Sequence, residues 1–90
     1  MTEFINIGFG NLINAGKIVA VVCPEAAPVK RLVQKAKESG RVIDATQGRK
    51  TKAVIVTEED HVILSALQPE TISRRFLAGR EAAWKGEEDE

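Results

Sequence analysis

A chain of 90 residues holds one small domain, because it is too short to form two independent hydrophobic cores. Hydrophobic residues make up 43% and charged residues 29%, with 7 Gly and 3 Pro, which excludes a disordered, collagen-like or low-complexity chain. Thirteen basic residues balance thirteen acidic ones, but the two signs are separated along the chain. Residues 1–57 hold nine basic and four acidic side chains, whereas residues 87–90 are all acidic. Because the first 57 residues carry an excess of positive charge, the chain can bind a polyanionic partner even though its net charge is zero.

Cysteine and histidine are too scarce for several classes of site. One Cys and one His exclude an intramolecular disulfide and supply too few ligands for a structural zinc site. The longest strongly apolar run, residues 18–23, is far shorter than the roughly 20 residues of a membrane helix. The N-terminus lacks the basic and long apolar segments of a secretory signal. We therefore expect a reduced, cytoplasmic protein without a membrane partner.

The first half of the chain predicts two strands and a helix. Alternating side chains predict a short strand over residues 4–7, and two glycines predict a turn at residues 8–11. Residues 17–23 carry Val and Ile at both odd and even positions, which predicts a strand buried on both faces. Cys23 is predicted to be a small buried side chain at the end of this strand. Apolar residues at helical spacing predict an amphipathic helix over residues 27–39, with a cationic outer face.

The second half predicts three more strands and a short helix. Residues 41–45 form the third predicted strand, and residues 46–51, which are polar around a central Gly, form a hairpin loop. Strands over residues 52–57 and 61–67 follow, joined by an acidic turn. Residues 70–78 predict the second helix. Short loops between these strands favour antiparallel pairing.

The fold class is therefore α+β, with a small antiparallel sheet of about five short strands, one amphipathic helix and a short C-terminal helix. We expect a single domain over residues 1–78 and a mobile acidic tail over residues 79–90. Short strands leave exposed edges, and a chain of this size buries a small core, so self-association is expected.

Enzymatic chemistry finds little support in the sequence. His61 and Asp44 with Ser65 or Thr46 could supply a triad, but no nucleophile-elbow motif accompanies them, and a hydrogen-bonded histidine at a strand end is the better interpretation. The glycines near Phe9 and Arg49 lack the spacing of dinucleotide or P-loop motifs and are better interpreted as turns. We expect no catalytic residues, no cofactor, no metal and no small-molecule substrate.

The strongest candidate site is the basic segment at residues 48–52. It places three positive charges and one hydroxyl within five residues at the predicted hairpin tip. Arg offers a planar fork of donors and Lys a point charge, and both bind phosphate groups. A solvated, solubilising turn is an equally open interpretation. The candidate DNA-binding residues are Arg49, Lys50, Thr51 and Lys52, with Arg31 and Lys17 as possible extensions.

Aromatic residues argue against one alternative partner. RNA-binding modules stack bases on aromatic side chains, whereas Phe4, Phe9, Phe76 and Trp84 all lie outside the basic segment. A few phosphate contacts per chain bind weakly, so a DNA-binding protein of this size needs several copies of the segment in one assembly.

Taken in order, several segments resemble one family. These are residues 5–11 (INIGFGN), residues 43–46 (IDAT) with Gly48-Arg49, residues 60–66 (DHVILSA) and residues 68–71 (QPET). Together they resemble the RemA family, small bacterial regulators of extracellular-matrix (biofilm) genes. The resemblance covers about residues 4–75.

This resemblance implies a DNA-binding transcriptional activator. It also implies a closed ring of identical subunits that engages double-stranded promoter DNA at repeated sites. At matching positions, Arg49 and Lys50 would touch DNA, with Lys17 and Arg31 as further candidates. Two alternatives stay open, namely an oligomeric scaffold and a nucleoid-type architectural protein without sequence preference.

Overall fold

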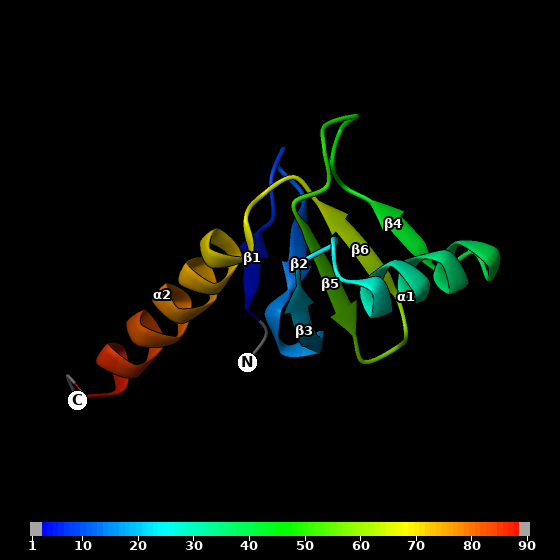
Figure 1. The fold of residues 1–90 in the computed structure, drawn as a ribbon. Coiled ribbons are helices and arrows are strands. Elements are labelled where there is room, and N and C mark those ends of the chain that lie inside the picture. Colours follow the sequence, from blue (N-terminus) through cyan, green and yellow to red (C-terminus); the bar gives the residue numbers. More distant parts are fainter. Residues whose placement is uncertain (1–2, 89–90) are drawn as a thin grey trace.

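The computed structural model describes the backbone of residues 3–88 and the side chains of residues 3–78 (Figure 1). Residues 3–88 form six strands and two α-helices, which confirms the α+β class and the two helices; the strands number six rather than about five. In order, the elements are β1 (Phe4–Asn6), β2 (Leu12–Asn14), the 3-10 turn η1 (Ala15–Lys17), β3 (Ile18–Val22), α1 (Ala27–Glu38), β4 (Val42–Asp44), β5 (Ala53–Thr57), β6 (Val62–Ser65) and α2 (Pro69–Glu88).

The main sheet has four strands in the order β3-β5-β6-β4. The pairs β3/β5 and β5/β6 are antiparallel, whereas β4 pairs with β6 in parallel. The prediction of a purely antiparallel sheet is therefore wrong. Because β4 lies beside β6 and not beside β5, the segment between β4 and β5 must cross the end of β6. The prediction that residues 46–51 form a hairpin loop is wrong for the same reason.

The four-stranded sheet is buried on both faces at its centre. Side chains alternate across β5 and β6, so that Val54, Val62 and Leu64 pack with Ala36 of α1. The opposite face packs against the β1–β2 hairpin and α2, with Ile55 at its centre. Figure 1 shows this layering, with α1 on one side of the sheet and the hairpin and α2 on the other.

A strand is confirmed within residues 17–23, at Ile18–Val22, but the prediction that it is buried on both faces is wrong. The observed β3 is an edge strand with only one neighbour, so its residues that pack against the core, Ile18, Val21 and Val22, are only partly buried. Val19 is 64% exposed, and the thiol of Cys23, which follows β3, is exposed as well. Double burial belongs instead to β5 and β6, whose apolar runs are equally continuous.

The N-terminal strand is confirmed at Phe4–Asn6, but its partner β2 was not predicted. Three residues are too few for a recognisable period, and β2 forms because the turn at residues 8–10 brings it back antiparallel to β1. Helix α2 extends beyond the predicted residues 70–78 to Glu88. The predicted mobile tail over residues 79–90 lies outside the residues whose side chains are described, and it stays a prediction.

Candidate nucleic-acid interface

The basic segment lies in an anchored loop between β4 and β5. At its start, the Asp44 carboxylate accepts hydrogen bonds from the hydroxyl and the backbone N–H of Thr46, at 2.6 and 2.9 Å. These two bonds, the hydroxyl one first, lower the pKa of Asp44 below its ordinary value. At its end, the backbone N–H of Lys52 donates to the carbonyl of Ser65 at 2.9 Å. Both ends of the loop are thus tied to the sheet.

Between these anchors the chain makes a tight turn. Gln47 and Gly48 have φ of 55° and 80°, the pattern of a type I′ turn, and the N–H of Arg49 donates to the carbonyl of Thr46 at 3.0 Å. Thr46 is 3% exposed, whereas Gln47 to Lys50 are exposed. The turn therefore projects the side chains of Arg49 and Lys50 from a buried base.

The tip of the β1–β2 hairpin lies against this loop. The Arg49 guanidinium carbon is 5.9 Å from the centroid of the Phe9 ring, within the range of a cation–π contact. Ser65 ties the hairpin in place, because its hydroxyl donates to the carbonyl of Ile7 at 2.8 Å. Figure 1 shows the two loops side by side at the same end of the molecule.

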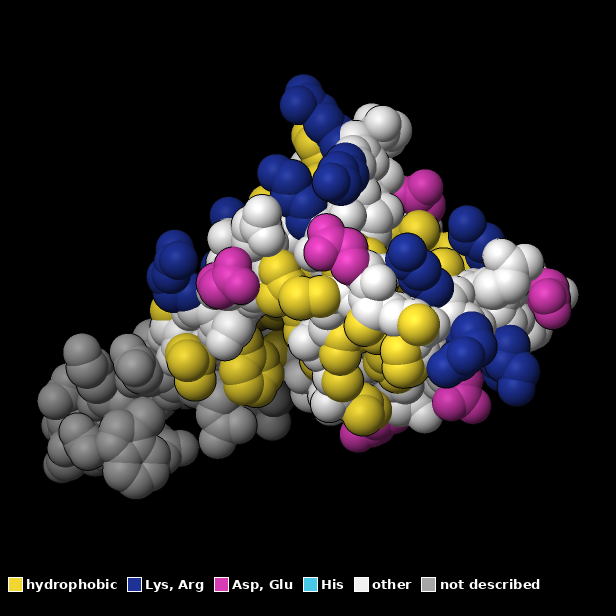
Figure 2. Space-filling model, viewed as in Figure 1, with side chains coloured by type: hydrophobic (Ala, Val, Ile, Leu, Met, Phe, Trp, Pro, Cys, Tyr) yellow, Lys and Arg dark blue, Asp and Glu magenta, His cyan; other side chains and the backbone are white. Residues whose placement is uncertain are grey.

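A pocket of about 410 Å³ opens between the hairpin tip and the loop. Arg49, Lys50 and Lys52 supply its cations, and the remaining lining is uncharged, from Gly8, Phe9, Ala66 and Leu67. Figure 2 shows dark-blue Lys and Arg side chains gathered at this tip, with hydrophobic surface beside them. The site combines three cations with an apolar wall.

Sequence reasoning missed the contribution of Phe9. It counted all aromatic residues as outside the basic segment, because 40 positions separate Phe9 from Arg49 along the chain. A signal was available, since a bulky side chain between two turn glycines has no neighbours of its own to bury it.

The other predicted site residues are not gathered at this tip. Thr51 lies in the loop and is half-buried. Lys17 precedes β3, at the end of the sheet opposite to the basic loop. There its ammonium forms a 3.7 Å ion pair with Glu58, which follows β5. About 17 Å of strand β5 separates that end from the loop. Arg31 is exposed on α1, which covers the opposite face of the sheet from the hairpin.

The residues of the considered triad are also kept apart. His61 precedes β6 and Ser65 ends it, so about 13 Å of strand lies between them. The Ser65 hydroxyl is fully buried and hydrogen-bonded to the backbone, and the Asp44 carboxylate is held by Thr46. The side chains of His61, Asp44 and Ser65 therefore do not form a hydrogen-bonded triad.

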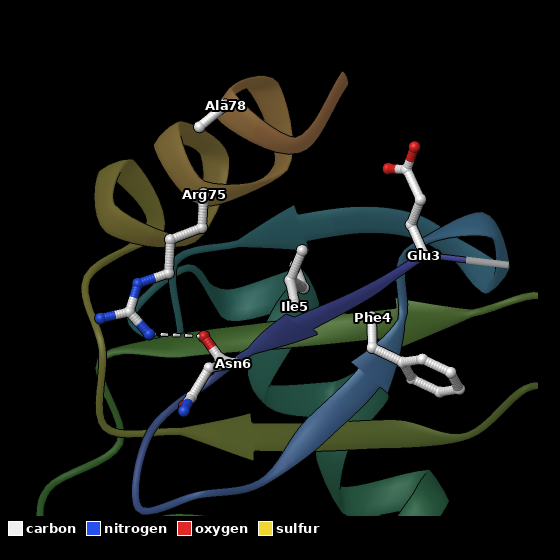
Figure 3. A pocket seen from close by; sticks show the side chains of 6 residues that line it. All are labelled: Glu3, Phe4, Ile5, Asn6, Arg75 and Ala78. Carbon is white, nitrogen blue, oxygen red and sulfur yellow. Dashed lines mark hydrogen bonds between the residues drawn. The ribbon is translucent and has the colours of Figure 1, made fainter. Parts of the chain in front are cut away.

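A second pocket, of about 630 Å³, lies between β1 and α2 (Figure 3). The Arg75 guanidinium on α2 donates a hydrogen bond to the carbonyl of Asn6 at 2.6 Å. This contact fastens the helix to the edge of the hairpin. The side chains of Glu3 and Phe4 point away from Arg75 (Figure 3). Within residues 3–88 no helix is long and apolar enough to cross a membrane, and the described side chains gather no group of three potential metal ligands.

Comparison with known proteins gives consistent matches over most of the chain. A profile of the RemA-like family, described as extracellular matrix regulatory protein A-like, matches residues 4–76. A protein of Synechococcus sp. (strain JA-2-3B'a(2-13)) is 58% identical over 79 residues, which cover 88% of this chain and 89% of the relative. One from Heliobacterium modesticaldum is 56% identical over 86 residues, or 96% and 93% of the two chains. Both carry the name "Putative regulatory protein".

Proposed function

The chain belongs to the RemA-like family of extracellular matrix regulatory protein A-like proteins, and from this premise we propose that its regulatory role is exerted by binding DNA. The observation that carries the proposal is the gathering of Arg49, Lys50 and Lys52 on one anchored, projecting loop. Such a loop presents donors to the phosphates of a duplex without first having to be ordered.

The charge on this loop sets the expected strength of binding. Three phosphate contacts release counterions, so the logarithm of the association constant should fall with the logarithm of salt concentration with a slope of about −2.7 per protomer. With only three phosphate contacts, a single protomer binds DNA weakly and in a salt-sensitive way. Useful affinity then requires several loops on one assembly, each binding the same duplex.

We further propose that the protein forms a homo-oligomeric ring. Large apolar side chains lie uncovered on its surface, which supports association with other copies. The main sheet also ends in two edge strands, β3 and β4, each with one neighbour. Of the large apolar side chains, those at least half exposed are Phe4, Phe9, Leu12, Val19, Ile43 and Leu77, of which Phe9 lies at the basic loop.

In this proposal the ring is a cytoplasmic activator of extracellular-matrix genes, without enzymatic activity. Membership in the RemA-like family supports the choice of target genes. Candidates outside the loop, Arg31 and Lys17, stay predicted DNA contacts, and single Ala variants of each would test them.

Fluorescence anisotropy tests the proposal. The purified protein is titrated onto an A·T-rich promoter duplex and onto a scrambled duplex at several salt concentrations. Arg49→Ala should weaken binding to both duplexes and reduce the salt slope by about one per bound protomer. Arg41→Ala, which removes an exposed arginine at the opposite end of β4 from the loop, serves as the matched control and should have a smaller effect.

The outcomes separate the alternatives. Tighter binding to the promoter supports a regulator that selects its site. Equal, salt-dependent binding to both duplexes indicates a nucleoid-type architectural protein. If the assembled wild type binds neither duplex near physiological salt, the DNA-binding proposal fails, and the exposed apolar surface would favour an oligomeric scaffold.

A further inference from the structure

We propose that Phe9 is a second DNA-contacting group of this site, and that its ring packs into a base step beside the phosphates held by Arg49. The inference rests on the proposed function, because it assigns a new residue and a new mode of contact to the same interface. It concerns duplex DNA and predicts a local unstacking of the bases that phosphate contacts alone do not produce.

The conformation of Phe9 is unfavourable for its side chain. Its φ is +54°, in the left-handed region that favours Gly and Asn and disfavours bulky residues. The surrounding turn holds it there, since the Asn11 N–H and side-chain amide both donate to the Gly8 carbonyl, at 3.0 and 2.9 Å. The Asn6 side chain accepts from the Gly8 N–H at 2.7 Å.

Burial does not account for a phenylalanine at this position. The side chain is 51% exposed at the tip of the hairpin, although apolar residues of the same hairpin, such as Ile7, are buried in the core. A strained residue that gains little from packing in the folded protein is a candidate for a contact outside it.

The surroundings of Phe9 indicate the chemistry of that contact. The centre of its ring lies 5.9 Å from the Arg49 guanidinium carbon, and the pocket beside it is lined by three cations and by apolar residues. An isolated phosphate would engage only the cations. Duplex DNA presents phosphates and, a short distance inside the groove, the apolar faces of a base step that can be opened. The combined surface fits this second kind of ligand.

The test measures unstacking directly. Promoter duplexes carry 2-aminopurine at successive T-A steps, and its fluorescence is recorded at saturating protein. Phe9→Asn removes the ring and keeps a residue that tolerates positive φ, so its Tm should equal or exceed that of the wild type. Phe9→Trp keeps an aromatic ring. Leu32→Asn is the control, because Leu32 is an exposed apolar residue of α1, away from the hairpin and the loop.

We expect fluorescence to rise on binding of the wild type and of the Phe9→Trp and Leu32→Asn variants, and to stay at the free-duplex level with Phe9→Asn. Phe9→Asn should also weaken binding about tenfold for each bound protomer, as loss of one stacking contact does, with an unchanged salt slope. The molar mass of each variant's assembly is measured by light scattering, and only variants that assemble to the same mass as the wild type are compared.

Other results would overturn the inference. If Phe9→Asn binds and perturbs the duplex like the wild type, Phe9 makes no base contact, although DNA binding itself would stand. If Phe9→Asn weakens binding but also reduces the salt slope, the ring acts only by positioning Arg49. Failure of the wild type to bind any duplex would instead refute the proposed function on which this inference rests.

Discussion

Replacing the buried Ser65 with Ala should destabilise the protein more than removing a hydroxyl from its surface would. The Ser65 side chain is fully buried; its hydroxyl donates to the Ile7 carbonyl at 2.8 Å and accepts from the Leu67 N–H at 3.1 Å. Ile7 is only 2% exposed, so water cannot readily replace the lost hydroxyl as a hydrogen-bond donor to the Ile7 carbonyl. A buried group left unsatisfied costs about 1–3 kcal/mol.

Leu67 is only half-buried, so its N–H can recover part of its loss by binding water. We therefore expect Ser65→Ala to lower the free energy of unfolding by about 2 kcal/mol. For a domain of this size that corresponds to a Tm about 8–16 °C lower. Urea unfolding followed by circular dichroism, at one fixed protein concentration, measures the difference.

Ser73→Ala is the matched control. Ser73 is exposed on α2, so the same chemical change should alter the free energy of unfolding by less than about 0.5 kcal/mol. If Ser65→Ala unfolds at the same urea concentration as Ser73→Ala, the bond between β6 and the hairpin contributes nothing to stability. The argument that this bond fixes the hairpin tip beside the basic loop would then be refuted.

The remaining predictions concern the loop and the end of β3. Because the Thr46 bonds lower the pKa of folded Asp44, the stabilisation they give should be complete above the ordinary value of 3.8 and be lost as pH falls through the lower folded value; Asp44→Asn should be less stable than the wild type at pH 6, and the difference should shrink below pH 3.8 in urea unfolding. Gly48→Ala places a side chain at φ +80°, so it should lower the free energy of unfolding by about 1 kcal/mol even though a Cβ meets no atom within 4 Å; an unchanged urea midpoint would contradict this. The exposed Cys23 thiol should react with Ellman's reagent without denaturant, and a thiol that reacts only after unfolding would show that another copy covers it.

The predictions for Asp44, Gly48 and Ser65 concern the supports of the same candidate site, because the hairpin and the loop contact each other. Asp44 and Gly48 shape the loop that carries Arg49, and Ser65 holds the hairpin that carries Phe9. A variant that disturbs either support should therefore weaken DNA binding without touching DNA itself. Measuring Tm and anisotropy on the same preparations separates this indirect effect from a lost contact.

Local patterns in the sequence determined several elements of this protein. Helix α1 follows from apolar residues at helical spacing with Pro28 at its start, and the β5–β6 hairpin follows from two apolar runs joined by a short acidic turn. The basic character of residues 48–52 also needs no fold to be recognised, since charge is a property of the residues themselves.

Only the tertiary structure decided how these elements meet. Residues 17–23 and β5 have similar apolar composition, and it is their place at the edge or the centre of the sheet that exposes Val19 and buries Ile55. Pairing of β4 with β6 turned an expected hairpin loop into a crossing segment. The same packing separated Lys17 from Arg49 and brought Phe9 to within 5.9 Å of it, because distance in a folded chain depends on which strands pair, and local sequence patterns carry no record of that pairing.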